Sequence, residues 1–487
     1  MSERESGVAI EAPAELTEAL REPGGILTEE EANAIYDRGR EAVVFALLTL
    51  AKERTELAQK LEQAKQPGPS TPSGMIPVYQ KPACNRRGKK PGRQEGHEGS
   101  RRGPPVKIDH HREHMLERCP DCGGPVSKTP TRKRKRIIEE IPEVQPEVTE
   151  HTICGYWCGT CHKTVESVVV DALPGATIGN HLLALTAWLH YGLGQTLSQI
   201  VAVLNFHLNF RISEGGLVQM WYRLQEILYG WYEQIGRDAR SSAVLHADET
   251  GWRVGGKTHW LWCFTSAVAT YYLIDRSRGQ PALKKFFTEA FEGTLITDFW
   301  GPYEKVQAAF KQKCLVHLFR EFEKVEVRNK SPAWVEFRKK LKRLLRDALR
   351  LNRREGMAES EHASRRARLD ERLDQVIDEP WTDPDARRLS ARLCKYRHEL
   401  LTFLDQPGLP SDNNQGEREI RPAVIIRKNS LCNRSHAGAE MQAVMMSIYR
   451  TLKLRGHDPI RSISAALREY LATGKLPPLP APATSLG

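Results

Sequence analysis

The sequence predicts a multidomain protein with an α/β core, and three features of the chain lead to this prediction. Short apolar runs after Ser242 have the spacing of strands, whereas residues 179–240 and 331–404 have the spacing of amphipathic helices. Two pairs of cysteines between residues 119 and 161 mark a small separate module. At 487 residues the chain is also too long for one ordinary core, so roughly two to four domains are expected.

The charge of the chain is concentrated in one segment. The net charge is +11 and the pI is about 9.1, which favours a polyanion as partner. Residues 80–136 contain 17 Lys and Arg but 6 Asp and Glu, an excess as large as the net charge of the whole chain. Such a local excess is typical of an arm that binds nucleic acid, and a solvated linker is the alternative.

Targeting signals are not evident in the sequence. The N-terminus is polar and acidic, unlike a signal peptide, and the longest apolar runs are much shorter than the roughly 20 residues of a membrane span. We therefore expect a soluble, cytoplasmic protein. Its ten cysteines then suggest metal ligands before disulfides.

The N-terminal part is expected to hold one helix and a basic linker. Residues 1–26 are predicted to be disordered and residues 27–66 helical, opened by a capping box of Thr28 and Glu31. A heptad-like seam suits a dimerising coiled coil or a helix packed on its own protein, and it comprises Val43, Leu47, Leu50, Leu57 and Leu61. Residues 67–105 are rich in Pro, Gly, Ser and basic residues and should be a flexible linker. The candidate DNA contacts in this linker are Lys89, Lys90, Arg93, Arg101 and Arg102.

The cysteine module, residues 106–170, predicts a structural zinc site. Two CxxC pairs are separated by 35 residues, and their four thiolates can complete a tetrahedral Zn²⁺ site: Cys119, Cys122, Cys158 and Cys161. The gap suggests that a hairpin separates the two pairs. Cys154 is close enough to be a substitute ligand, and a redox-active CxxC would not explain a second pair. Because four thiolates leave no open coordination position, this zinc should fold the module.

Residues 171–240 are expected to be helical, with a helix-turn-helix pattern. Ile200, Val203 and Leu204 form the apolar face of the first helix, and Ser213 can cap the second. Leu217, Met220 and Trp221 would then face inward. The second helix could read DNA, but any pair of antiparallel helices in a helical domain has the same pattern.

Residues 241–458 should contain a sheet interrupted by helices. Residues 258–266 and 267–275 are expected to form an antiparallel pair of strands. Residues 293–301 and 311–319 are two more strand candidates, separated by helical residues 302–310. Residues 331–404 are expected to be helical and basic, and residues 459–487 to form a helix and a Pro-rich tail.

Three acids in this region suggest a metal site. Asp248 is expected to end one strand and Asp298 another, and Glu417 follows Asn413 and Asn414, either of which can cap a short helix. Two aspartates at strand ends and a glutamate on a helix suit two Mg²⁺ ions, which can stabilise both oxygens of a phosphodiester displacement.

Ordinary structural roles for these residues are also open. Glu417 could form a helical ion pair with Arg421, and Glu419 competes with it as the third ligand. Pro422 disfavours a long uninterrupted helix here. Glu249 should point to the opposite face of the strand from Asp248, so we exclude it as a ligand and expect it to be structural or solvated.

Several segments together resemble the insertion-sequence-66 type of DDE transposases. They are residues 247–266, 295–306, 314–322 and 412–440, with the basic linker and the paired CxxC motifs before them. The likeness runs in the expected order from about Glu30 to Asp458. It implies a ribonuclease-H-like catalytic core with a mixed sheet, flanking helices and a helical insertion at residues 331–404.

The resemblance also implies site residues and partners. Asp248, Asp298 and Glu417 match the three catalytic acids, which would hold two Mg²⁺ ions. His317 and Arg320 match a recurring His and Arg, for which we infer a phosphate contact, with a buried structural His as the alternative. Further candidate DNA contacts are Arg421, Arg427 and Lys428. The implied partners are element-end and target duplexes, further copies of the chain and accessory proteins of the same element, in the bacterial nucleoid.

The expected function is therefore a transposase that binds the terminal inverted repeats of its own element, cleaves them with metal ions and transfers the strand. A zinc-dependent DNA-binding regulator without enzymatic activity is the alternative from another class, but it gives Asp298 and Glu417 no role. A nuclease without strand transfer is a third interpretation.

Overall fold

A computed structural model describes residues 29–65, 103, 105–353 and 356–483. The chain divides into two compact units, Met1–Gln80 and Lys81–Gly487. Three predictions lie outside the described residues: the disordered N-terminal tail, the capping box and the DNA contacts of the basic linker. These contacts are Lys89, Lys90, Arg93, Arg101 and Arg102.

Within residues 29–65, the described part of the N-terminal unit, there are two helices where one was predicted. They are α2, Glu29–Asp37, and α3, Arg40–Lys65. The break falls at Gly39, whose φ of +96° lies outside the helical region and is open to glycine. Leu47 and Leu57 are 61% and 64% exposed on α3. These two leucines of the seam are therefore accessible, and the coiled coil stays a prediction.

The cysteine module has little regular structure. Its only two strands among the described residues are β1, Gly155–Cys158, and β2, Lys163–Glu166, which pair antiparallel. The expected hairpin therefore does not separate the two cysteine pairs: it carries the second pair at its own turn, between Cys158 and Cys161.

The following helical region contains α4, Asn180–Ala187, a π-helix at Trp188–Gly192, α5, Leu197–His207, and α6, Glu214–Arg240. Ser213 caps α6 as predicted, since its side chain accepts a hydrogen bond from the Gly216 amide. Leu217 and Trp221 are buried, whereas Met220 is half-buried. The Trp221 indole donates to Thr186 at 3.2 Å, so α6 is fixed against α4 by its inward face.

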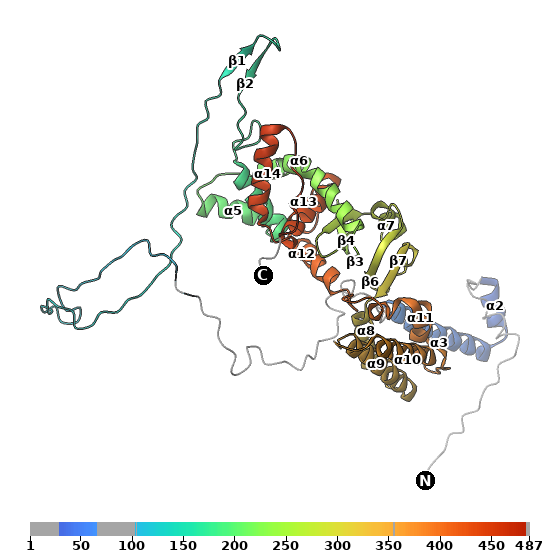
Figure 1. The fold of residues 1–487 in the computed structure, drawn as a ribbon. Helices are drawn as coiled ribbons and strands as arrows, with labels where there is room; N and C mark the ends of the chain where they lie inside the picture. The colour runs from blue at the N-terminus through green and yellow to red at the C-terminus, as the bar shows by residue number, and fades with distance from the viewer. Residues whose placement is uncertain (1–28, 66–102, 104, 354–355, 484–487) are drawn as a thin grey trace. The chain divides into compact units, whose positions relative to one another are not determined.

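The central sheet has the strand order β5-β4-β3-β6-β7 (Figure 1). Its strands are β3, Val244–Val254, β4, Lys257–Thr265, β5, Thr270–Asp275, β6, Phe291–Thr297, and β7, Ala308–Lys313. β3, β4 and β5 form an antiparallel meander, while β6 and β7 run parallel to β3. The connection from β5 to β6 contains α7, Gln280–Phe286.

Two of the predicted boundaries in this region were wrong. The expected helix at residues 302–310 is only a 3₁₀ turn at Gly301–Lys305, because residues 308–310 already belong to β7. The expected strand at residues 311–319 ends at Lys313, and α8, Leu315–Arg328, begins directly afterwards. A short apolar run does not distinguish a buried strand from a buried first turn of helix.

A helical insertion follows α8 and has a core of its own. It contains α9, Pro332–Asn352, α10, Glu359–Asp378, and α11, Pro384–Lys395, with short 3₁₀ turns at Arg397–Glu399 and Thr402–Leu404. The predicted apolar stripe of α9 is buried, with Trp334, Phe337 and Leu341 fully inaccessible. These side chains pack with α10 and α11 in a cluster separate from that around the sheet's centre. The helices of the insertion lie together beside α8 in Figure 1.

Three helices complete the chain: α12, Asn414–Ser430, α13, His436–Leu454, and α14, Pro459–Thr473. α12 packs against β3 and β4, and α13 against β5 and α6. Contrary to the sequence prediction, α12 continues through Pro422. The carbonyl that loses its partner belongs to Arg418, an exposed residue, so water can replace the missing N–H. Among the described helices, none is long and apolar enough to cross a membrane.

Candidate active site and zinc module

The parallel register of β3 and β6 places Asp248 opposite Asp298. The last paired residues are His246 and Ile296, and each aspartate lies two residues further along its strand direction. Because side chains alternate with a period of two, both carboxylates leave the sheet on the same face as that last pair. The two acids are therefore neighbours although 50 positions separate them in the sequence.

Asp248 was predicted to end a strand, but it lies within one. β3 continues to Val254 because β4 pairs with it as far as Lys257. What ends near Asp248 is the pairing with β6, so this part of β3 has a partner on one edge only. The predicted strand end at Asp248 was therefore wrong, because β3 continues for six residues beyond it.

Glu417 is brought to the aspartates by a buried side chain at the start of α12. Asn413, 1% exposed, donates from Nδ2 to the carbonyl of Ala247 at 2.9 Å. Its Oδ1 accepts from Nδ1 of the buried His246 at 3.0 Å. The side chain of Asn413 therefore does not cap the helix, contrary to the possibility raised from the sequence. It joins the first turn of α12 to β3 instead.

Gly416 makes this junction possible. A Cβ at this position would lie 2.8 Å from Oδ1 and 3.0 Å from Nδ2 of Asn413. Any larger residue would push the amide away from β3. The junction sets Glu417, one residue later, on the side of α12 that faces Asp248.

The three acids interact electrostatically. Burial raises the pKa of Asp248 well above its usual value, and the charges of Glu249, Asp298 and Glu417 raise it further. The charges of Asp298 and Glu417 therefore add to the negative potential at Asp248, and a hard divalent cation compensates such a charge. Three carboxylates are the type of donor that Mg²⁺ prefers, although within the described part of the chain they are not close enough together to form a complete metal site.

One oxygen of each aspartate is fixed by the backbone. Oδ1 of Asp248 accepts from the Glu249 amide at 2.9 Å, and Oδ1 of Asp298 accepts from the Trp300 amide at 2.8 Å. These contacts orient the carboxylates and leave the second oxygen of each for another ligand.

Lys313 forms hydrogen bonds at the end of β6, beside Asp298. This lysine is fully buried, and its Nζ donates to Thr297 Oγ1 at 2.9 Å and to the Asp298 carbonyl at 3.1 Å. Burial lowers the pKa of Lys313, while Glu399, 3.6 Å away, favours the charged form. Lys313 was not predicted from the sequence, because β7 reads AAFKQK and nothing in it distinguishes the buried Lys313 from the neighbouring Lys311.

Arg320 and His317 lie beside Glu417. Arg320 forms a bidentate pair with Glu417, at 2.7 and 3.0 Å. This pair replaces the helical pair with Arg421 that was the structural alternative for Glu417. His317 Nε2 is 3.9 Å from Glu417 Oε1, and burial lowers the pKa of this histidine. Both residues thus belong to the acidic site, whereas their contact with phosphate stays a prediction.

Glu249 points to the opposite face, as predicted, and it is structural rather than solvated. Its carboxylate, 2% exposed, accepts from Arg278 at 2.9 Å and from the Tyr303 hydroxyl at 2.6 Å. Burial and the charge of Asp298 raise the pKa of Glu249 to about 7, although Tyr303 and Arg278 favour its charged form. Arg278 in turn lies between the rings of Trp260 and Trp300, so this network holds the loop that contains Asp298.

The remaining candidates on α12 have different surroundings. Glu419, the competing acid, is buried and paired with Arg450 at 2.7 Å. Arg427 donates to the Gly251 carbonyl at 2.6 Å and therefore ties α12 to β3. Arg421 and Lys428 are exposed, and their spacing places them on the same face of α12 as Glu417.

Each CxxC pair has the local geometry of a zinc knuckle. In the first, Gly123 has a φ of +71° and its amide donates to the Cys119 carbonyl at 2.9 Å. In the second, the Cys161 amide donates to the sulfur of Cys158 at 3.4 Å. Backbone N–H groups lower the pKa of Cys119 and of Cys158, which favours the thiolates that bind Zn²⁺.

The structure does not bring the two pairs together. Among the described residues, no group of three or more His, Cys, Asp and Glu side chains is arranged to hold a metal ion. All four cysteines are free thiols, as is the exposed Cys154. The joint site, and the place of Cys154 in it, stay predictions.

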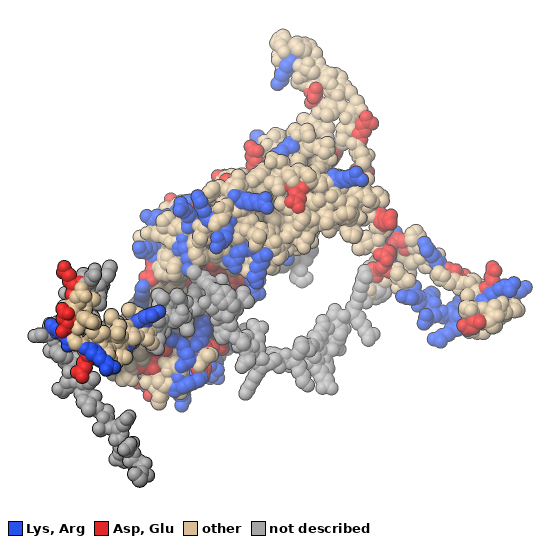
Figure 2. Space-filling model, turned by 180° about the vertical axis from the view of Figure 1, so that it is seen from behind, with Lys and Arg blue, Asp and Glu red and all other residues tan. Residues whose placement is uncertain are grey.

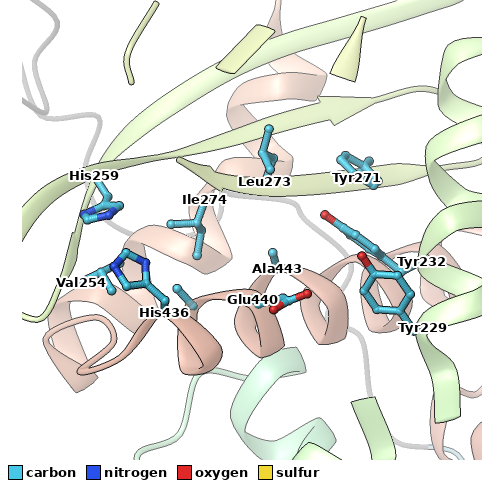
Figure 3. Close-up of a pocket in the computed structure, with 11 residues that line it drawn as sticks. Tyr229, Tyr232, Val254, His259, Tyr271, Leu273, Ile274, His436, Glu440 and Ala443 are labelled. Atoms are coloured by element: carbon cyan, nitrogen blue, oxygen red, sulfur yellow. The ribbon is translucent and has the colours of Figure 1, made fainter. Parts of the chain in front are cut away.

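A hollow of about 280 Å³ lies along the outer strand β5 and is chemically unlike the acidic site (Figure 3). Tyrosines from α6 and β5 line it together with His259 of β4 and His436 and Glu440 of α13. None of its lining residues is Lys, Arg or one of the three acids. It therefore does not suit a phosphate.

Comparison with known proteins agrees with the sequence resemblance. A family model described as Transposase IS66 family matches residues 175–441, and one described as zinc-finger binding domain of transposase IS66 matches residues 117–162. The uncharacterized protein y4qI of Sinorhizobium fredii is 26% identical over 245 residues, 44% of each chain. The protein y4jD of the same organism is 24% identical over 243 residues, 43% of this chain and 44% of its own. The chain thus spans less than half the length of these relatives.

The two family matches confirm the resemblance found in the sequence. The first covers the sheet, the helical insertion and all three candidate acids, and the second covers both CxxC pairs. Because the first match extends over more than half of the 487 residues, the chain belongs to the transposase IS66 family.

Proposed function

We propose that the protein is a DNA transposase that cleaves the ends of its own element and joins them to target DNA, with Asp248, Asp298 and Glu417 as metal ligands. The observation that carries this proposal is the convergence of the three acids, one from β3, one from the end of β6 and one from α12. A mixed sheet with flanking helices also supports the ribonuclease-H-like core that the family implies.

The three carboxylates would hold two Mg²⁺ ions. When bound, these ions would activate water and stabilise the charge that develops on the transferring phosphate. The zinc module would hold one structural Zn²⁺ through Cys119, Cys122, Cys158 and Cys161, since each pair favours thiolates.

The chain's own residues would orient the DNA. Arg421 and Lys428 are exposed on the face of α12 that carries Glu417, so they can contact phosphates beside the acids. Lys313 and the pair of Arg278 with Glu249 are positioning residues, because they hold the backbone around Asp298 without reaching the surface of the site. The order of steps would be hydrolysis at each element end and then attack of the freed 3′-hydroxyl on the target.

Cleavage of labelled duplexes that contain the DNA flanking the gene tests the proposal. We expect cutting by the wild-type chain with Mg²⁺, and loss of cutting with retained binding in Asp298→Asn. Joined products with added target DNA would distinguish transposition from simple nuclease activity. Equal cutting by both chains would refute the assignment of Asp298, and binding by an active preparation that never cuts would favour the regulator.

A further inference from the structure

A cleft between α9 and α10 of the helical insertion is lined mainly by arginine. It has a volume of about 260 Å³, and its lining contains four arginines, one aspartate and two leucines: Arg350, Arg365, Arg368, Arg372, Asp347, Leu351 and Leu369. None of these residues belongs to the acidic site. The sequence analysis described this region only as basic and helical.

The arginines are arranged so that their charge is only partly compensated. Asp347 accepts from Arg350 at 3.4 Å and from Arg372 at 3.0 Å, and so holds two guanidinium groups at one wall. Arg365 pairs with Glu361 of its own helix, where both side chains are about half-exposed. Arg368 has no ion-pair partner within the described part of the chain. Exposed ion pairs of this kind contribute little stability, so an incoming anion can take the place of the carboxylate in each pair.

The chemistry of the cleft fits phosphate better than a protein side chain. A guanidinium group offers a planar fork that matches two phosphate oxygens. The two leucines are 6% and 4% exposed, so they form the floor of the cleft and offer little apolar surface to a protein partner. A binding site with excess positive charge and little accessible apolar area selects an anion.

The basic surface is longer than one phosphate. Lys339, Arg343, Arg346 and Arg350 are all exposed on α9, and their spacings of four, three and four place them on one face. The first three have no ion-pair partner among the residues that the structure describes. With a rise of 1.5 Å per residue the row extends about 16 Å, the axial length of roughly five phosphates of one DNA strand. On the face of the molecule seen in Figure 2, Lys and Arg cover more of the surface than Asp and Glu do.

We propose that the cleft between α9 and α10 binds the phosphate backbone of a DNA duplex, and that the basic row of α9 extends this contact. The identity of the polyanion as DNA rests on the proposed function. The insertion then serves as a second DNA-binding surface, which holds the duplex outside the acidic site and is indifferent to its sequence.

The salt dependence of DNA binding tests this inference in the full chain. We would measure anisotropy with a labelled random-sequence duplex of about 30 base pairs over a range of salt concentrations. For Arg350→Ala with Arg368→Ala we expect weaker binding and a slope of log K against log salt that is smaller by about 1.8, since each lost phosphate contact removes about 0.9. The matched control is Arg461→Ala with Arg468→Ala on α14, two arginines that are also exposed, and its slope should stay within half that change.

Further measurements separate charge from structure and binding from cleavage. Arg350→Lys with Arg368→Lys should keep most of the slope, because the charges remain, and thermal unfolding checks that each variant folds. An unchanged slope in the alanine variant would overturn the inference, whether or not the affinity fell. A smaller slope in a chain that never cuts DNA would support the cleft and count only against the proposed catalytic activity.

Discussion

Replacement of Asn413 by alanine should disconnect Glu417 from the aspartates. The change removes the acceptor of His246 Nδ1 and the donor to the Ala247 carbonyl, both in a buried place. An orphaned buried polar group costs about 1–3 kcal/mol, so two of them should destabilise the domain by about 3 kcal/mol or more. Because the start of α12 also loses its attachment to β3, cleavage should fall by more than tenfold even where the protein is folded.

The neighbouring asparagine provides a matched control. Asn414 has the same side chain one residue later, but it is exposed. Asn414→Ala should therefore change stability by less than about 0.5 kcal/mol and leave cleavage near the wild-type rate. Urea unfolding followed by tryptophan fluorescence measures the stability, and three of the ten tryptophans, Trp252, Trp260 and Trp262, lie in β3 and β4. Similar stability and activity in the two variants would refute the role of Asn413 as a junction.

Three other changes test the same structure. Gly416→Ala should destabilise the domain by about 1–3 kcal/mol because its Cβ would meet the buried amide at 2.8 Å, whereas Gly215→Ala, with nothing within 4 Å, should be neutral or stabilising in urea unfolding. Lys313→Met should reduce cleavage more than duplex binding, since it removes two hydrogen bonds at the end of β6 but no exposed charge; equal losses of both would speak against a positioning role. Cys119→Ser with Cys122→Ser should lower the zinc content of the purified chain by about one ion and weaken end binding, and full zinc occupancy by metal analysis would contradict the assignment.

The sequence predicted correctly those elements that a local pattern of residues is sufficient to identify. The strands at residues 258–265 and 270–275 follow from buried apolar runs, and Ser213 follows from its place before a helix. Asp248 and Asp298 were candidates because each follows a short apolar run, and Glu417 because it follows two asparagines that can cap a helix. What identified them together was the resemblance of several ordered segments, which spacing alone did not supply.

The residues that hold the site together could not be predicted from local pattern. Asn413 has the composition of a helix cap, but its amide bonds to a strand more than 160 positions earlier. Lys313 has the composition of a solvated strand end, but it is fully buried. In both cases a long-range contact satisfies the polar group, and single-sequence reasoning sees only near neighbours. The continuation of α12 through Pro422 is a similar case, since packing on β3 and β4 outweighs the local cost of proline.

The three acids differ in how firmly they are held, and this difference bears on which of them can adapt to a metal ion. Asp248 and Asp298 lie on or directly after paired strands, and a backbone amide orients each of them. Glu417 instead is held by Arg320, whose side chain is 48% exposed. An ion pair that water reaches so readily contributes little net stability, so exchanging the guanidinium group for a divalent cation costs little. We infer that the aspartates form the preorganised part of the site and that Glu417 is the ligand that can rearrange, while Asn413 keeps its helix in place.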